Sequence, residues 1–246
     1  MTVRHHWSEK PGFRLQPGII DIWLCQGDTV QERLEHLGTL LSAEERARAQ
    51  RFKFEIHRNR FIISHGFQRS ILAKYLNIAP ASIQYQLSDK GKPSLIADER
   101  DLTFNLSHTE DISILAVTCD AEVGVDVEYM DRKADWQAIG QRFFTAPEQQ
   151  ALFSLPKEKQ QSAFYQLWTR KEAYMKILGS GFSLLPTAFT LTVPPQPPAL
   201  IQHHSTKIQA TMQVEFIDIE LPDELMNYCA TLAAGALVGG VNCYQW

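Results

Sequence analysis

The sequence predicts an α+β fold. Two observations carry this prediction: helically spaced apolar residues are followed by a run of short extended segments, and the second half of the chain restarts the same plan. A chain of 246 residues has room for one large domain or for two modest ones packed together. We therefore expect stretches of helix followed by stretches of strand, in an order that occurs twice.

The first half begins with a buried strand at residues 18–24, bounded by turn-forming residues. A helix is expected to start at Ser42, because Ser42 and Glu45 have the spacing of a capping box, which satisfies unpaired backbone N–H groups. Residues 58–76 place apolar side chains at helical spacing. Short extended runs then follow at residues 83–87, 102–106, 113–118 and 123–128.

Two features of the sequence indicate that the second half repeats the plan of the first. Thr145 and Glu148 have the same cap-like spacing, and Phe164 follows Thr145 by the 19 residues that separate Phe61 from Ser42. The alternative is that two helices merely share a common start signal. After a helix at 164–178, strands are expected at 188–193, 213–219 and 228–238, and the proline-rich run 194–198 is interpreted as a rigid loop.

The composition is that of a soluble globular protein, with 44% hydrophobic and 21% charged residues. A net charge of −4 argues against a generally basic nucleic-acid binder and is compatible with a local cationic pocket. The four cysteines are far apart and the N-terminus lacks a signal-peptide core, which favours a cytoplasmic protein. The longest apolar stretch, near 228–241, is interrupted by glycines and too short to span a membrane, so we expect no membrane partner.

Two carboxylates, Asp126 and Glu128, alternate with valines in the run Val-Gly-Val-Asp-Val-Glu at 123–128. In a strand, this alternation buries the valines and presents both carboxylates on the opposite face, with Cα atoms about 7 Å apart. Two such carboxylates can converge on one hard cation, and magnesium favours oxygen ligands. The alternative is a solvated polar face of a strand.

A second acidic element lies in the run Trp-Thr-Arg-Lys-Glu-Ala at 168–173. Trp168, Glu172 and Lys176 recur every four residues and therefore share one face of a helix. That face offers an apolar wall, an oxygen ligand or base, and a cation. The alternative is a surface Glu172–Lys176 ion pair beside a tryptophan of the core.

Three further features are candidates for binding an anionic ligand. Ser107 and His108 close an extended run at a turn, although a lone histidine there is often structural and no nucleophile triad accompanies Ser107. Lys92 lies in a tight Gly-Lys-Pro turn, which can clamp a phosphate or a purine edge or be an ordinary surface turn. The last feature is a basic run whose members can be solvated or can grip a phosphate: Arg46, Arg48, Arg51, Lys53, Arg58 and Arg60.

In this order, the motifs Gly-Lys-Pro (91–93), Phe-Asn-Leu-Ser-His (104–108), Gly-Val-Asp-Val-Glu (124–128) and Trp-Thr-Arg-Lys-Glu-Ala (168–173) closely resemble those of the Sfp-type 4′-phosphopantetheinyl transferases. The resemblance extends from Ser42 through Arg-Phe-Phe-Thr (142–145) to residues 179–183, and beyond that it is limited to a strand-rich character. It implies a monomer of two similar α+β halves related by a pseudo-twofold axis, with coenzyme A and magnesium bound in the cleft between them. The expected halves are residues 1–120, with coenzyme A contacts, and 121–246, with the metal site and catalytic helix.

The resemblance also implies roles for individual residues. Asp126 and Glu128 match the family's metal-binding pair, and Glu172 matches its third ligand and proposed general base. Lys171 and Lys176 match lysines near the pyrophosphate. The remaining coenzyme A contacts that it implies are Ser107, His108, Lys92 and, for the 3′-phosphate, Arg48, with Arg46 and Arg60 as further candidates. Glu45 departs from the pattern, because a lysine can occur at that position.

The reaction implied is transfer of 4′-phosphopantetheine from coenzyme A to a serine of an apo carrier protein, with release of 3′,5′-ADP. Catalysis is expected from Glu172, Lys176 and His108, with the acceptor serving fatty-acid, polyketide or nonribosomal peptide synthesis. Carriers of this kind are acidic helical bundles, and the segment between Asp126 and Trp168, including Phe143, Phe144 and Leu152, is expected to help receive one. The alternatives are another magnesium-dependent phosphoryl or nucleotidyl transferase and a coenzyme A binding module without catalysis.

Overall fold

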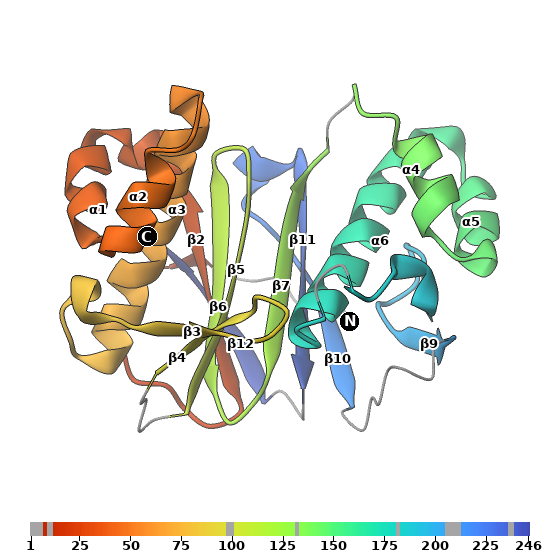
Figure 1. The fold of residues 1–246 in the computed structure, drawn as a ribbon. Helices are drawn as coiled ribbons and strands as arrows, with labels where there is room; N and C mark the ends of the chain where they lie inside the picture. Colours follow the sequence, from red (N-terminus) through yellow and green to blue (C-terminus); the bar gives the residue numbers. More distant parts are fainter. Residues whose placement is uncertain are drawn as a thin grey trace.

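The computed structural model describes residues 7–8, 12–96, 101–130, 133–180, 183–204, 213–235 and 239–246. Its centre consists of two sheets, with helices on both outer sides (Figure 1). Helices α1 (Leu34–Leu40), α2 (Ala43–Ala49) and α3 (Glu55–Leu76) cover one side, and α4 (Trp136–Phe143), α5 (Ala146–Phe153) and α6 (Lys157–Ile177) cover the other. The α+β class predicted from the sequence is confirmed.

The larger sheet has the order β1-β12-β2-β6-β5. Its strands are β1 (Trp7–Ser8), β12 (Gly240–Gln245), β2 (Ile19–Gln26), β6 (Ile112–Cys119) and β5 (Leu102–Thr109). β12 runs parallel to β1 and β2, whereas the β2–β6 and β6–β5 pairs are antiparallel. The smaller sheet is antiparallel throughout and consists of β10 (Val214–Ile219), β11 (Tyr228–Gly235) and β7 (Val123–Tyr129).

The two sheets share one apolar core, and each packs a long helix against its other face. Ile20 and Ile22 of β2 face Val125 and Val127 of β7 in the shared core. Trp23, between those isoleucines, belongs instead to the core beneath α3. Because both faces of β2 are buried, its sequence is a nearly continuous apolar run rather than an alternating one. The corresponding outer core, under α6, includes Phe164, Leu167 and Tyr174 of that helix.

Among the described residues, two small hairpins and four short 3₁₀ helices accompany these sheets and helices. The hairpins are β3 (Tyr85–Leu87) with β4 (Pro93–Leu95) and β8 (Phe189–Leu191) with β9 (Leu200–His203). The 3₁₀ helices are η1 (Gly27–Arg33), η2 (Pro80–Ser82), η4 (Pro186–Ala188) and η5 (Asp223–Leu225). Within the described ranges, none of the helices combines the length and the apolar character needed to cross a membrane.

Both predicted helix starts are capping boxes. The Ser42 hydroxyl accepts from the backbone N–H of Glu45 at 3.1 Å, and the Glu45 carboxylate accepts from the N–H of Ser42 at 2.8 Å. Thr145 and Glu148 form the same motif, with the Glu148 carboxylate 2.7 Å from the N–H of Thr145. In each half the capped helix precedes a long helix that covers a sheet, so the repeated plan extends beyond a shared start signal.

Some boundaries differ from the prediction. The long helices begin earlier than expected, at Glu55 and Lys157, and the strand expected at 83–87 begins only at Tyr85. Of the strand expected at 228–238, the last three residues lie outside the described part, as do residues 181 and 182 of the 179–183 segment. The strand β12 follows β11 in sequence but pairs with β2, so each half contributes to the larger sheet. A division at residue 120 stays a prediction.

Candidate active site

The close approach of α6 to β7 creates the site, and Gly124 permits it. A Cβ atom at Gly124 would lie 2.3 Å from the carbonyl oxygen of Ala173 and 2.5 Å from the nitrogen of Ile177. Only glycine allows the helix backbone to sit this close to the strand. Since alternate residues of a strand face opposite ways, Asp126 and Glu128 point to the same side as Gly124, towards α6.

Asp126 is held at one oxygen and left free at the other. Its Oδ1 accepts from Lys176 Nζ at 2.7 Å and from the Ser107 hydroxyl at 2.9 Å. Its Oδ2 is buried and has no hydrogen-bond partner among the described residues. Lys176 also donates to the Ser107 hydroxyl at 2.7 Å and to the carbonyl of Val125 at 3.0 Å. Strands β5 and β7 and helix α6 therefore meet at one polar cluster.

A cavity of about 370 Å³ opens beside this cluster. It lies between β5 of the first half and β7 and α6 of the second, and it brings together most of the residues predicted from the motifs. Its polar and aromatic lining residues are Ser107, His108, Asp126, Glu128, Trp168, Glu172 and Lys176. The predicted shared helix face of Trp168, Glu172 and Lys176 is thus present, and it faces a cavity.

The three carboxyl groups that line this cavity have raised pKa values. Burial, and next the negative charge of Asp126, raise the pKa of Glu172 to about 7, with Lys176 opposing the shift. Burial and Asp126 likewise raise the pKa of Glu128 to about 7, and Glu172 adds to that shift. Burial also raises the pKa of Asp126 itself, although Lys176 and Ser107 act against it. Burial is the largest cause of all three raised pKa values, and a cation would stabilise this set of carboxyl groups in ionised form.

The donor set fits a divalent cation. Carboxylate oxygens are the ligands that hard cations prefer, and the unpartnered Oδ2 of Asp126 is an oxygen that such an ion can use. In the part of the chain that the structure describes, no three His, Cys, Asp or Glu side chains are arranged so that they could hold a metal ion as they stand. The three carboxylates share a cavity, and Lys176 supplies the positive charge nearest to Asp126.

A second cavity, of about 260 Å³, adjoins the first and shares Glu172 and Lys176 with it. Its other lining residues are Lys90, Gly91, Lys92, Pro93, Asn105, Met175 and Gly179. The predicted Gly-Lys-Pro turn is therefore part of the site. Lys92 itself directs its ammonium to Glu122 at 2.6 Å and to the carbonyl of Ile177 at 3.2 Å.

The candidate cations around His108 differ in their partners. His108 is an exposed residue at the edge of the 370 Å³ cavity. Burial of part of its ring, followed by the charges of Lys176, Arg48 and Arg60, lowers its pKa. Arg60 is neutralised by Asp111 at 2.9 Å and Glu110 at 2.5 Å. Arg48 lies over the Phe61 ring, 5.2 Å from its centroid, and is the member of this group without an acidic partner among the described residues.

Glu45, which departs from the family motif, has a structural task. Its carboxylate caps α2 and also accepts from Arg69 Nε at 2.6 Å. Arg69 in turn donates to the carbonyls of Pro80 and Ile83. Arg46, the suggested substitute, donates to the carbonyl of Leu41. Both side chains near the start of α2 are thus engaged with the protein.

Lys171 was expected near the pyrophosphate, and the structure places it elsewhere. Its side chain is 0% exposed and pairs with Glu148 at 2.8 Å, and it donates to the carbonyls of Pro186 and Phe189. The reason is the helical period: Lys171 is about 100° around α6 from Glu172, on a face that packs against η4 and β8. Lys171 lines neither cavity of the site.

The expected carrier-receiving residues need a similar correction. Phe144 is 2% exposed and Leu152 is 0% exposed, since both belong to the core beneath α6. Phe143 is partly buried and contacts the Trp168 ring edge-on, with centroids 5.8 Å apart. Buried side chains cannot contact a partner protein. Phe144 and Leu152 instead belong to the apolar core on which α6 packs.

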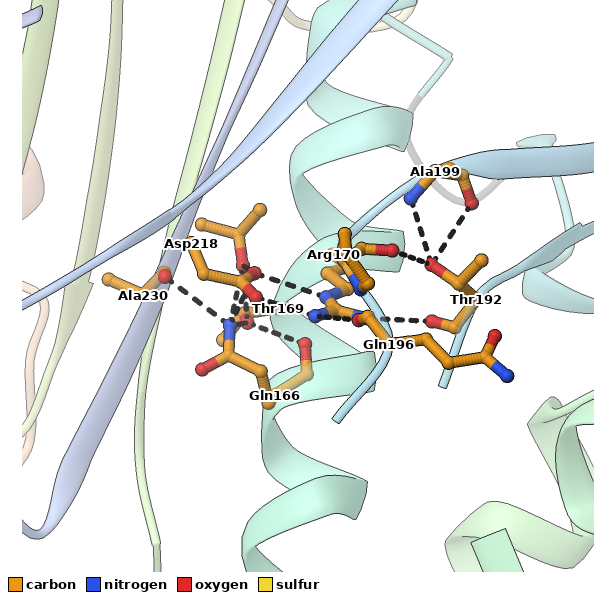
Figure 2. Close-up of polar contacts among 10 residues, drawn as sticks. Gln166, Thr169, Arg170, Thr192, Gln196, Ala199, Asp218 and Ala230 are labelled. Atoms are coloured by element: carbon orange, nitrogen blue, oxygen red, sulfur yellow. Dashed lines mark hydrogen bonds and ion pairs between the residues drawn. The ribbon is translucent and has the colours of Figure 1, made fainter. Parts of the chain in front are cut away.

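Sequence reasoning missed the polar network that holds the back of α6. Arg170, 2% exposed, donates to Asp218 of β10 at 3.1 and 2.5 Å and to the carbonyls of Thr192 and Gln196 (Figure 2). Gln166, one turn earlier, donates to Asp218 at 2.9 Å (Figure 2). It also donates to Thr231 at 2.8 Å. Their i, i+4 spacing was the signal that could have revealed a second polar face.

Comparison with known proteins identifies the family. Residues 122–233 match the family model of the 4′-phosphopantetheinyl transferase superfamily, and residues 28–120 match the model of the N-terminal part of a 4′-phosphopantetheinyl transferase. The 4′-phosphopantetheinyl transferase HetI of Nostoc sp. is 36% identical over 204 residues, which cover 81% of this chain and 85% of HetI. The chain belongs to the 4′-phosphopantetheinyl transferase superfamily. The resemblance drawn from the motifs and the predicted enzyme class are thereby confirmed.

A second curated relative agrees with that placement. The 4′-phosphopantetheinyl transferase Sfp of Bacillus subtilis is 30% identical over 161 residues, covering 65% of this chain and 70% of Sfp. A solved holo-(acyl-carrier-protein) synthase from Bacillus anthracis, in complex with CoA (3′,5′-ADP), aligns with a TM-score of 0.32 and 19% identity, over 40% of this chain and 91% of that one. Of these two curated relatives, HetI matches the larger part of the chain.

Proposed function

We propose that the chain transfers the 4′-phosphopantetheine group of coenzyme A to a serine hydroxyl of an apo carrier protein and releases 3′,5′-ADP. Family membership supports the reaction class. The observation that carries the proposal is the shared wall of two cavities, where Glu172 and Lys176 lie beside Asp126. A diphosphate at that wall would leave one half of coenzyme A in each cavity.

The residues that would hold a magnesium ion are Asp126, Glu128 and Glu172. Their gathering in one cavity and the unpartnered Oδ2 of Asp126 support this assignment. A magnesium ion bound there would offset the charge that builds up on the diphosphate when its bond breaks. Two of the three ligands come from one strand and the third from a helix, so the packing of α6 on β7 sets their separation.

The side chains that line the cavity can accept the proton of the carrier serine and stabilise the negative charge of the departing 3′,5′-ADP. Glu172, whose pKa is raised to about 7, is suited to accept the proton of the carrier serine as its oxygen bonds to the β-phosphorus. The bond between that phosphorus and the oxygen of 3′,5′-ADP breaks, and the negative charge leaves with 3′,5′-ADP. Lys176 stabilises that charge, and His108, at the outer edge of the cavity, orients the phosphates.

Further features of the substrate complex follow from the free groups around the site. Arg48 is the candidate for the 3′-phosphate because no acidic side chain of the described residues pairs with it. Arg60 could contribute only after giving up part of its pairing with Glu110 and Asp111. Ser107 acts mainly by fixing Asp126 and Lys176.

We further propose that the protein works in the cytoplasm as a monomer, with halves that divide near residue 120, where the two matched family models meet.

Intact-mass spectrometry of purified apo carrier proteins tests the reaction directly. Each carrier is incubated with the protein, coenzyme A and magnesium, and the expected result is the addition of one phosphopantetheinyl group to the carrier together with release of 3′,5′-ADP. Carriers in which alanine replaces the acceptor serine are the control. Release of a nucleotide other than 3′,5′-ADP would favour another phosphoryl or nucleotidyl transferase, and tight coenzyme A binding with no modified carrier would favour a binding module.

The role of Glu172 is tested by Glu172→Gln. The amide keeps the size of the side chain but cannot accept the proton, so kcat is expected to fall at least about 100-fold, within the range for loss of a general base. The affinity for coenzyme A, measured by calorimetry without magnesium, is expected to change much less. An unchanged kcat would refute the assignment of Glu172 as the base.

A further inference from the structure

Thr231 of β11 lies beside Asp126 on the face of the smaller sheet that α6 covers. The two residues are direct partners in the antiparallel pairing of β11 with β7, and direct partners place their side chains on the same face of a sheet. The Thr231 hydroxyl is 2.9 Å from the Thr169 hydroxyl of α6, and both residues are 0% exposed. A buried hydrogen bond between β11 and α6 is thus adjacent to a residue of the proposed metal site.

Asp218 of β10 gives this hydrogen bond a direction. Its Oδ1 accepts from the Thr231 hydroxyl at 3.1 Å and from Gln166 at 2.9 Å, because a carboxylate oxygen can only accept. Since the single proton of the Thr231 hydroxyl is then used, the Thr169 hydroxyl donates to Thr231. Arg170 holds the same carboxylate through two nitrogens (Figure 2). The chain of donors therefore begins on α6 and ends at a carboxylate that the helix itself fixes.

Thr169 and Lys176 are two turns apart on one side of α6. Seven residues of an α-helix return to within about 20° of the same direction, and Glu172 lies between the two. Thr169 binds β11, and Lys176 binds Asp126 of β7 at 2.7 Å. The stretch of helix that carries Glu172 is therefore tied to the sheet near both of its ends. These two ties together set the position of Glu172 relative to Asp126.

Only one of these two ties uses groups that the proposed reaction would engage. Lys176 would turn to the diphosphate and Asp126 would hold the magnesium ion, so their mutual contact would weaken when the substrates bind. The other tie consists of side chains that line neither cavity, and it can persist in the loaded site: Gln166, Thr169, Asp218 and Thr231.

We propose that Thr231, through its hydrogen bond with Thr169, positions Glu172 for magnesium binding and for proton transfer. Thr231 is a positioning residue, since it lines neither cavity and acts through the helix. The inference rests on the proposed function and deepens it. The tie to Thr231 keeps Glu172 in place when Lys176 leaves its carboxylate partner.

The test is Thr231→Val, which keeps the shape of the side chain and removes the hydroxyl. The neighbours retain partners: Asp218 keeps Arg170 and Gln166. The Thr169 hydroxyl keeps the carbonyl of Gln166, so the variant is expected to fold. Magnesium affinity, measured by calorimetry without coenzyme A, is expected to fall about tenfold, as when a group that orients a metal ligand is removed. The kcat is expected to fall with it, while the KM for coenzyme A stays unchanged.

Two further variants separate positioning from general stability. Thr231→Ser returns the hydroxyl and is expected to restore the magnesium affinity and kcat. Thr118→Val removes an equally buried hydroxyl from the larger sheet, where Thr118 is 1% exposed and donates to the carbonyl of Ile19 at 2.9 Å. It is expected to lower stability and to leave magnesium affinity and kcat unchanged. Equal losses of magnesium affinity in Thr118→Val and Thr231→Val would overturn the inference.

Thr169→Val tests the route from β11 to the helix. If the two threonines act through their mutual hydrogen bond, the double variant Thr169→Val/Thr231→Val is expected to bind magnesium as weakly as either single variant and no more weakly. Losses that add in the double variant would mean that the two hydroxyls act separately, which contradicts the proposed route.

A second measurement does not depend on a variant folding. In ¹⁵N spectra of the unaltered protein, the side-chain amide signals of Gln166 are expected to stay in place when magnesium and coenzyme A are added together, while the ammonium signal of Lys176 moves. Gln166 signals that move as far as the Lys176 signal would show that the network does not persist, and the inference would fall.

The failure of this inference differs from a failure of the proposed function. Unchanged magnesium affinity and kcat in Thr231→Val would overturn the positioning role, and the proposed function survives if the unaltered protein still modifies a carrier. An unaltered protein that modifies no carrier would overturn the proposed function, whereas the magnesium affinities of the variants would still decide whether Thr231 positions Glu172.

Discussion

Lys176 donates to Oδ1 of Asp126 at 2.7 Å, while Oδ2 of the same carboxylate has no partner among the described residues. The two residues lie 50 positions apart, one on β7 and one on α6. Their contact joins the strand that supplies two carboxylates to the helix that supplies the third. The free oxygen beside a fixed cation suggests how the site would receive both a metal ion and a diphosphate.

Asp126→Asn tests the metal assignment. The amide oxygen can still accept from Ser107 and Lys176, but the side chain loses its charge and presents an NH₂ group where Oδ2 was. We expect kcat to fall by roughly 100-fold or more, as when one preorganised electrostatic partner of a reaction is removed, and the magnesium affinity measured by calorimetry to fall with it. Glu220→Gln, an exposed carboxylate away from both cavities, is the matched control. A normal rate at the same magnesium concentration would contradict the assignment.

The stabilisation by magnesium should depend on pH. The pKa values of Glu128 and Glu172 are raised to about 7 in the folded protein, from an ordinary 4.5. Between these values the folded state binds more protons than the unfolded state, so these two groups make the metal-free protein less stable as pH rises. A magnesium ion favours the ionised carboxylates, and its effect on Tm is therefore expected to be larger at pH 8 than at pH 6.

Thermal unfolding with magnesium and with EDTA at both pH values measures this difference. The double variant Glu128→Gln/Glu172→Gln removes both titrating groups and is expected to lose most of the pH dependence of the magnesium effect. An equal magnesium-induced change of Tm at pH 6 and pH 8 in the unaltered protein would count against the raised pKa values as the cause.

Gly124→Ala should separate α6 from β7. A Cβ atom there would meet the backbone of Ala173 and Ile177 at 2.3 and 2.5 Å, and backbone cannot move aside as a flexible side chain can. We expect a loss of about 1–3 kcal/mol or more in the free energy of unfolding, as for other overpacked sites. Because the separation would also part Glu172 from Asp126, activity should fall in the protein that remains folded.

Urea denaturation and an activity assay on the folded fraction provide these two measurements. Gly38→Ala is the control, since a Cβ atom in that helix would be 4.0 Å from its nearest neighbour, Ile62. Replacing a helical glycine with alanine is expected to be neutral or to stabilise by roughly 0.5–1 kcal/mol. Similar stability losses in both variants would show that close backbone packing at Gly124 is not the cause.

Lys171→Met should affect stability and not ligand binding. The substitution leaves Glu148 buried with two backbone N–H groups and without its countercharge. Breaking a buried ion pair in this way costs about 3–5 kcal/mol. The affinity of the folded protein for coenzyme A is expected to be unchanged, because Lys171 lines neither cavity.

Lys157→Met, at the exposed start of the same helix, is the control and is expected to change stability by less than about 0.5 kcal/mol. Chemical denaturation and calorimetry with coenzyme A supply the two readouts. If Lys171→Met kept full stability but lost coenzyme A affinity, the lysine would contact the pyrophosphate after all.

Much of the site was predictable because it consists of local periodic patterns. Alternation along residues 123–128 was sufficient to place Asp126 and Glu128 on one strand face, and a four-residue spacing was sufficient to align Glu172 with Lys176. Both capping boxes were predictable for the same reason, since each is confined to four consecutive residues. Such features depend only on the geometry of one strand or one helical turn.

The residues that were assigned to the wrong part of the molecule depend instead on contacts between elements that are far apart in the sequence. Lys171 is next to Glu172 in sequence, and only its contact with Glu148 shows that it belongs to the core. Phe144 and Leu152 could not be recognised as buried without knowing that α4 and α5 pack against α6. The C-terminal strand β12 gave no local sign that it would join β2.

The sequence by itself determined the α+β class, the two capped helices and which side chains of each element can share a face. The tertiary structure decided which faces meet: that β5 and β7 carry Asn105 and Asp126 to α6, and that Gly124 lets the helix approach. The physical reason is that periodicity acts over a few residues. Contacts between elements depend instead on how whole surfaces pack, a property that no short segment encodes.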